Sequence, residues 1–207
     1  NVGFEWHSAA DFAGVEGLKA GVSAGFGDDG DTNTTSTAEN SYSVGLSYVT
    51  TTGDTTVTVG GGYMMAEDSN TTSVNDKANQ VAISLSAATG NLTVGAGFGS
   101  GSSMNANSGA STLVDAAEVV TAGAKYVSGD MTFTIGMVAG EAKDTTTFTA
   151  AGSNTDSYNL VSASVDYAVM SGITATVAYA DEDAEEEGTS VAANSGSSWY
   201  IGANITF

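Results

Sequence analysis

Cysteine, proline and arginine are absent from the sequence, and its only strongly basic residues are four lysines. The absence of cysteine excludes a disulfide framework, a thiolate metal site and a cysteine nucleophile. The four lysines stand against 24 aspartates and glutamates, which leaves a formal charge of -20 over 207 residues. Because phosphate binding needs clustered lysine and arginine, this balance argues against a nucleic-acid partner.

Long apolar runs are absent as well. Hydrophobic residues make up 41% of the chain, but no run approaches the roughly 20 apolar residues that a membrane-spanning helix needs. No basic segment followed by an apolar one opens the chain, so we expect any export signal to lie outside this sequence. Abundant serine, threonine and glycine would suit a disordered or fibrous protein too, so the periodicity of the apolar residues has to decide.

Residues 199–207 alternate strictly between apolar and polar side chains. One side carries Trp199, Ile201, Ala203, Ile205 and Phe207, and the other carries Tyr200, Gly202, Asn204 and Thr206. This period of two is typical of a β-strand with one apolar and one wet face. The stretch resembles the closing strand of bacterial outer-membrane barrels, which ends in a phenylalanine preceded by apolar residues at alternate positions.

The same alternation recurs about ten more times, in segments of about ten residues, the length that a tilted strand needs to cross a bilayer. These segments cover residues 2–6, 18–26, 42–48, 57–63, 81–87, 92–98, 120–126, 133–139, 161–167 and 173–179. Short glycine-containing turns at 52–54, 89–91, 128–130 and 170–172 alternate with long polar stretches at 27–40, 66–77, 99–116, 141–156 and 181–197. Turns at one end and loops at the other predict an all-β, transmembrane, antiparallel up-and-down β-barrel with about eleven strands in this sequence.

Aromatic residues on the apolar face group at the two ends of the predicted strands, as in the two interfacial girdles of a barrel in lipid. The set at the turn end is Tyr48, Tyr126, Phe133, Tyr167 and Phe207, and the set at the loop end is Phe26, Tyr42, Tyr63, Phe98, Tyr179 and Trp199. Tyr158 and Tyr200 fall on the wet face instead, as lumen residues or at local bulges.

Throughout its length, the sequence resembles a general, non-specific outer-membrane porin of the alphaproteobacterial type. The resemblance rests on glycine-rich hairpin strands such as YSVGLSY (42–48) and TVTVGGGY (56–63), on the acidic loops and on the closing aromatic strand. It implies a homotrimer of barrels with about 16 strands each. This chain would then be the C-terminal two-thirds of one barrel domain, without its first strands and its inward-folded constriction loop. An arginine cluster usual at the constriction has no counterpart here.

The strand count gives independent support for missing strands. With about eleven strands, the first and last both run toward the periplasm, whereas single-chain barrels of this class have an even number. Either residues 1–8 form no strand, or strands precede Asn1. We favour the second explanation.

Six residues on the wet face are predicted to line the pore: Glu5, His7, Lys19, Lys125, Asp166 and Asn204. Carboxylates and ammoniums facing each other across a water-filled lumen would set a transverse field that orients polar solutes. His7 is the only histidine and could serve as the general base of a barrel hydrolase. Since no serine has a distinctive setting beside it, we expect a solvated wall residue and no enzymatic activity.

Asp29, Asp31 and Asn33 space three oxygen ligands like the start of a calcium loop, but the glycine and glutamate that complete an EF-hand are missing. Together with the acidic run at 181–187, they place dense negative charge in the predicted outward loops. This charge either forms a solvated rim or binds Ca²⁺ or Mg²⁺ that bridges loops or lipopolysaccharide phosphates.

The sequence therefore predicts a cation-preferring outer-membrane channel for passive diffusion of small hydrophilic solutes and ions, without a cofactor. Its expected partners are outer-membrane lipid, lipopolysaccharide and two further copies of the chain. An extracellular calcium-binding structural or adhesive β-protein is the alternative, and it would be soluble without detergent. A complete smaller barrel of ten or twelve strands is a third possibility.

Overall fold

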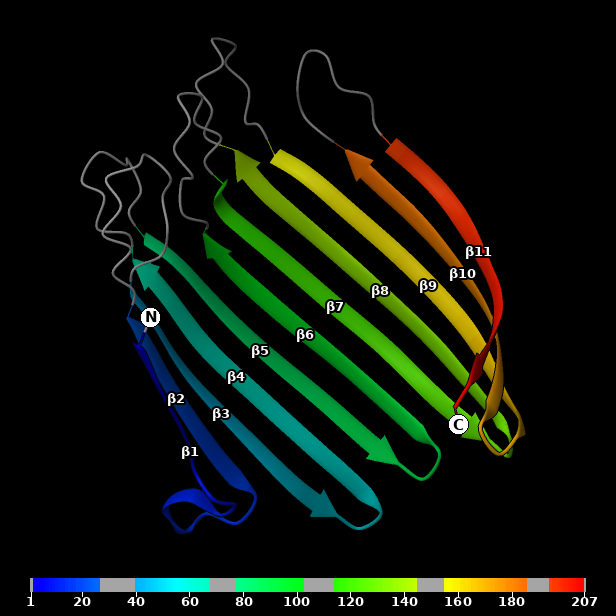
Figure 1. Cartoon of the computed structure of the whole chain (residues 1–207), viewed down its shortest axis with the longest axis horizontal. Helices are drawn as coiled ribbons and strands as arrows, with labels where there is room; N and C mark the ends of the chain where they lie inside the picture. Colours follow the sequence, from blue (N-terminus) through cyan, green and yellow to red (C-terminus); the bar gives the residue numbers. More distant parts are fainter. Residues whose placement is uncertain are drawn as a thin grey trace.

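A single antiparallel β-sheet accounts for nearly all of the structure (Figure 1). The computed structural model describes residues 2–26, 40–67, 77–102, 114–144, 155–185 and 194–206. In these residues each strand pairs only with its neighbours in sequence, from β1 to β11. The elements are β1 (Val2–His7), η1 (Phe12–Gly14, a 3₁₀ turn), β2 (Leu18–Phe26), β3 (Asn40–Thr52), β4 (Thr55–Glu67), β5 (Lys77–Thr89), β6 (Leu92–Ser102), β7 (Val114–Ser128), β8 (Met131–Asp144), β9 (Thr155–Met170), β10 (Ile173–Glu185) and β11 (Asn194–Ile205).

The pairing register joins the apolar positions of successive strands into one continuous face. Val22 lies opposite Val44, Val44 opposite Tyr63, and Tyr63 opposite Val81. Directly opposed residues in an antiparallel pair project to the same side of the sheet. A slip of one residue would move every apolar side chain to the other face, so the alternation in the sequence sets the register.

Glycines form the tight turns at one end of the sheet. Gly53, Gly90, Gly129 and Gly172 all have positive φ, between 52° and 79°. The first three each follow a strand directly, and Gly172 directly precedes β10. A residue without a Cβ adopts this conformation at no steric cost. The segment 8–17 between β1 and β2 lies at the same end (Figure 1). Residues 2–7 form strand β1, so the odd strand count does not arise from the absence of a strand at residues 1–8.

The predicted long loops are shorter than the polar stretches that suggested them. β6 continues to Ser102 and β7 begins at Val114, although residues 99–116 were expected to form a loop. Likewise, β10 extends through the acidic residues to Glu185. Polar residues pair through their backbones as well as apolar ones do, so the change to polar sequence does not mark the strand end.

The sheet has no second layer. Among the described residues no hydrophobic side chain is buried, and Ile83, Ile135 and Ile201 are 58%, 55% and 81% exposed. The sheet curves into an open trough whose outer strands, β1 and β11, are not paired with each other in the described residues (Figure 1). No helix in this part of the chain is long and apolar enough to cross a membrane. A sheet left apolar on one side needs an apolar medium or partner to cover it.

Candidate functional site

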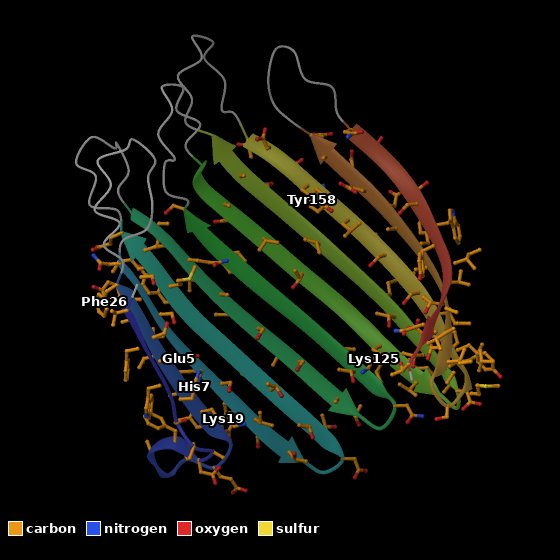
Figure 2. The ribbon with its side chains drawn as sticks, in the orientation of Figure 1. Glu5, His7, Lys19, Phe26, Lys125 and Tyr158 are labelled. Carbon is orange, nitrogen blue, oxygen red and sulfur yellow. The ribbon has the colours of Figure 1, made fainter. Side chains whose placement is uncertain are left out.

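The sheet has an inner and an outer face, which differ in chemistry. Glu5, His7, Lys19, Lys125 and Tyr158 lie on the inner, concave face, whereas Phe26 projects from the outer face (Figure 2). A residue that lies directly opposite one of these on a neighbouring strand projects from the same face of the sheet. The outer face is the continuous apolar one, and the inner face carries mainly glycine, alanine, serine and threonine.

Small side chains keep the inner face shallow. The opposed series Gly21, Gly45 and Gly62 crosses β2, β3 and β4. One step away, the hydroxyls of Ser23 and Ser43 hydrogen-bond across β2 and β3 at 2.8 Å. Short polar groups of this kind present hydrogen-bonding atoms to water without filling the space enclosed by the curved sheet.

Glu5, His7 and Lys19 lie together at the β1 edge of the inner face. Glu5 Oε1 and His7 Nε2 are 2.6 Å apart, and both side chains are about 70% exposed. The imidazole lies against Gly21, where a Cβ would come within 3.0 Å of Nδ1. Lys19 lines the same shallow hollow together with Ser23. The partner that orients His7 is therefore a carboxylate on its own strand, and both side chains are open to water.

Lys125, Asp166 and Asn204 come from β7, β9 and β11, in the same half of the inner face. Thr134 lies opposite Lys125, and β8, which carries it, separates Lys125 from Asp166. Thr176 Oγ1 donates a hydrogen bond of 2.5 Å to Asp166 Oδ1. Lys125 and Asp166 thus share one stretch of wall and do not face each other across a lumen. Any transverse field would have to run from these residues to Glu5, His7 and Lys19 on β1 and β2.

Among the described side chains, most of the negative charge lies away from the inner face. Among the side chains that the structure describes, the charged residues there are Glu5, Asp156, Asp166, Glu182, Lys19 and Lys125, besides His7. Asp156 and Glu182 lie near the loop ends of β9 and β10. Deeper in the wall, two carboxylates are balanced by two ammoniums.

The aromatic residues predicted to form two girdles lie on the outer face, with the exception of Phe207, which is outside the described residues. Tyr126 lies opposite Phe133 at the turn end. At the loop end, the ring centroids of Tyr179 and Trp199 are 4.8 Å apart, and those of Phe26 and Tyr42 are 6.0 Å apart in an edge-to-face arrangement. The ten described members are Tyr48, Tyr126, Phe133, Tyr167, Phe26, Tyr42, Tyr63, Phe98, Tyr179 and Trp199.

Sequence reasoning missed a further aromatic pair at the turn end. The rings of Trp6 and Phe12 make an edge-to-face contact at 5.7 Å. Trp6 belongs to an alternating segment, which was a usable signal. Phe12 lies in the non-strand segment between β1 and β2, where a period of two gives no information about position.

Tyr158 and Tyr200 are regular inner-face residues. Tyr158 lies opposite Gly140 in an unshifted stretch of the β8–β9 ladder, and Tyr200 lies opposite Ala178 in the β10–β11 ladder. The recorded register irregularities are near Val114 and Ile173, so neither tyrosine reaches this face through a bulge.

Asp29, Asp31 and Asn33, the weak calcium-ligand candidates, lie outside the described residues. Within the residues that are described, no group of three or more histidine, cysteine, aspartate or glutamate side chains is arranged to hold a metal ion.

The chain is similar in fold to solved proteins that include an outer membrane protein of Vibrio cholerae. OccAB4 of Acinetobacter baumannii matches 99% of this chain over 52% of its own length, with a TM-score of 0.65 and 15% identity. In-vitro folded OmpT of Vibrio cholerae matches 98% of this chain over 63% of its own length, with a TM-score of 0.61 and 15% identity. OccK2 of Pseudomonas aeruginosa, solved in complex with glucuronate, matches 98% over 62% of its length (TM-score 0.57, 10% identity).

The chain thus spans between about half and two thirds of the length of these structures. A search of curated proteins by sequence found no match. A family model described as Gram-negative porin matches residues 9–205, nearly the whole sheet with its apolar outer and polar inner face. The chain therefore belongs to the Gram-negative porin family and is an outer-membrane protein.

Proposed function

We propose that this chain forms the wall of a water-filled channel through which small hydrophilic solutes and ions diffuse passively. One observation carries the proposal: a curved sheet one layer thick has an uncovered apolar outer face and an inner face of small polar residues. Lipid covers the first face and water the second, as in outer-membrane barrels whose interior is polar. The channel needs no cofactor and carries out no reaction, and the Glu5–His7 pair belongs to the wetted wall.

The eleven strands are proposed to be one segment of a larger closed wall, a single barrel domain of the general, alphaproteobacterial porin type. In the described residues β1 and β11 each have one unpaired edge. An unpaired backbone edge in hydrocarbon leaves N–H and C=O groups without partners, at a cost of several kcal/mol each. Since β1 and β11 run in the same direction, an odd number of further strands would close the sheet with antiparallel pairs throughout.

Cations are proposed to pass more readily than anions. The inner-wall charges largely cancel below the loop ends, whereas Asp156 and Glu182 add negative charge near those ends. The chain as a whole carries -20. Carboxylates around a channel mouth concentrate cations there within about a Debye length, roughly 8 to 10 Å at moderate salt.

The proposed partners are outer-membrane lipid, lipopolysaccharide and two further copies of the chain in a homotrimer. On the outer face near the loop end, Glu118 lies opposite Glu141. Divalent cations such as Ca²⁺ at acidic groups near the outer membrane surface would link them to lipopolysaccharide phosphates. The acidic residues Asp29 and Asp31 are further candidates for such binding.

Planar-bilayer recording tests the channel and its ion preference together. The full-length protein, with the further strands proposed to close the wall, is refolded in detergent and added to a bilayer under a KCl gradient. It is expected to give stepwise conductance. Its reversal potential should have the sign of potassium permeation. A gel band that shifts when the sample is boiled identifies folded protein, and an absence of conductance from such protein would reject the channel. A reversal potential with the sign of chloride permeation would reject the cation preference alone.

A further inference from the structure

The inner face of β9, β10 and β11 carries a feature that the channel as such does not require. Tyr200 is 56% exposed, and its phenol leans along β11 over Gly202. A Cβ on Gly202 would overlap the phenol oxygen and the adjoining ring carbons. The ring therefore occupies the space that only a glycine leaves open at this position, and its hydroxyl lies one step closer to the turn end than its own Cα.

This leaning ring brings the hydroxyl of Tyr200 into line with two other oxygen groups. Gly202 lies opposite Thr176, and Thr176 lies opposite Asp166. Neighbouring strands are about 4.8 Å apart, so the three groups form a row across β11, β10 and β9. We call Tyr200, Thr176 and Asp166 the hydroxyl row. Asn204 lies one step further toward the turn end on the same face.

The hydroxyl row offers both hydrogen-bond donors and acceptors. Thr176 donates its proton to Asp166, which leaves the threonine oxygen as an acceptor, and the carboxylate can accept several further bonds. The Tyr200 hydroxyl can donate or accept, and the Asn204 amide does both. The phenol ring adds an apolar surface beside these groups.

The hydroxyl row combines one carboxylate with two hydroxyl groups, a set that suits a ligand with several hydroxyls. Asp166 is the only carboxylate in the row. Lys125 lies on the same face, two strands from Asp166 and one inner-face position closer to the loop end. At a separation of at least two strand spacings, about 10 Å, water and salt largely screen this ammonium from the carboxylate. The hydrogen bond from Thr176 engages Oδ1 of Asp166. A solute with many hydroxyls and C–H faces meets donors, acceptors and an aromatic surface here without having to carry charge.

We propose that the hydroxyl row is a weak binding site for neutral sugars on the channel wall. The inference rests on the proposed channel, since solutes reach the inner face through its lumen. Tyr200 and Asp166 are the residues that bind the sugar, and Gly202 is the positioning residue that lets the phenol lie in the row.

Sugar titration of single channels tests the site. Maltose is the probe, added in millimolar steps to the full-length protein, with its wall closed by the further strands, in a planar bilayer while the ion current is recorded. We expect maltose to reduce the current with a saturable dependence. Tyr200→Phe and Asp166→Asn should each weaken apparent binding by about threefold to tenfold, the effect of one hydrogen bond. Tyr158→Phe, the same change at another inner-face tyrosine, should leave the affinity unaltered.

Gly202→Ala separates binding from a merely structural role. The new methyl group must push the phenol aside, which costs little because it meets the far end of a flexible side chain. Apparent maltose affinity should therefore fall as in Tyr200→Phe, although the tyrosine is still present. Conductance without any maltose effect, or equal losses in Tyr158→Phe and Tyr200→Phe, would overturn the site and leave the channel intact. If no variant conducts, calorimetry of maltose with the folded protein in detergent decides the site separately from the channel.

Discussion

At the scale of single residues, Gly17 is fixed by two hydrogen bonds and by a close approach to the backbone of β3. Its φ is +79°, its N–H donates to Asp11 Oδ1 at 2.7 Å, and its carbonyl accepts from Val49 N at 3.0 Å. A Cβ there would collide with the carbonyl oxygen of Val49. The glycine thus joins the segment 8–17 to the end of β3, and both its backbone angle and its lack of a side chain are required.

We expect Gly17→Ala to lower the free energy of unfolding by more than about 1 kcal/mol, because alanine at positive φ is strained and this one also meets backbone. Gly14→Ala is the matched control. Gly14 has φ +77°, but nothing lies within 4 Å of its Cβ position. Urea titration of the refolded protein, followed by the heat-shifted gel band, measures both. Equal losses in the two variants would show that the contact with Val49 contributes nothing.

The spatial neighbours of a residue on this sheet follow from register, which the sequence alone determines only in part. Tyr200 and Gly202 are two positions apart, so their shared face was evident from alternation. Lys125 and Asp166 are 41 positions apart by their numbers, and the sequence predicts only that both line the lumen, where such charges would face each other. Only the observed pairing through β8 places both on one stretch of wall.

At the scale of the strand, alternation was the most reliable signal. All predicted alternating segments up to residue 179 lie within strands β1 to β10, because a face in contact with lipid tolerates few polar side chains. Strand ends were less predictable, as β6 and β10 show by continuing into polar sequence. The backbone ladder has no preference for apolar side chains, so composition indicates where the lipid is expected to end and not where the pairing ends.

Two adjacent positions on β5 test the assignment of the faces. Ile83 is on the outer face and 58% exposed, whereas Ser84 is on the inner face between Gly60 and Gly97. Ile83→Lys should destabilise the protein folded in phospholipid vesicles by about 2 to 4 kcal/mol, the cost of lysine near the bilayer midplane. Ser84→Lys should cost far less, because its ammonium reaches water and its neighbours are glycines. The urea midpoint in vesicles is the measurement. A larger loss of stability in Ser84→Lys than in Ile83→Lys would mean that lipid covers the inner face and water the outer face.

At the scale of the whole molecule, the distribution of charge matters more than its sum. The formal charge of -20 alone suggested a strongly cation-attracting pore. The structure instead shows balanced charge along the described inner wall below the loop ends. Attraction of cations would therefore depend on charges near the mouths of the channel, which water and salt screen more than charges in a narrow wall.

The cation preference should consequently depend on ionic strength. The Debye length shrinks from about 30 Å at 0.01 M salt to about 3 Å at 1 M, so mouth charges act on ions in the channel only at low salt. We expect the ratio of potassium to chloride permeability to approach unity as KCl is raised over this range. Reversal potentials at a fixed concentration ratio measure it. A ratio that stays constant would assign the preference to charges inside the pore.

Because each strand contacts only the strands beside it in sequence, the hairpin is the unit from which this protein is built. Two consecutive strands could be duplicated or deleted without reversing the direction of any other strand or interrupting another turn. The perimeter of the enclosed space would then change in increments of one hairpin, about 10 Å of sheet width, while the thickness of membrane that the strands cross stays constant. Evolution can thereby adjust the bore of such a channel by copying or losing a short piece of its gene.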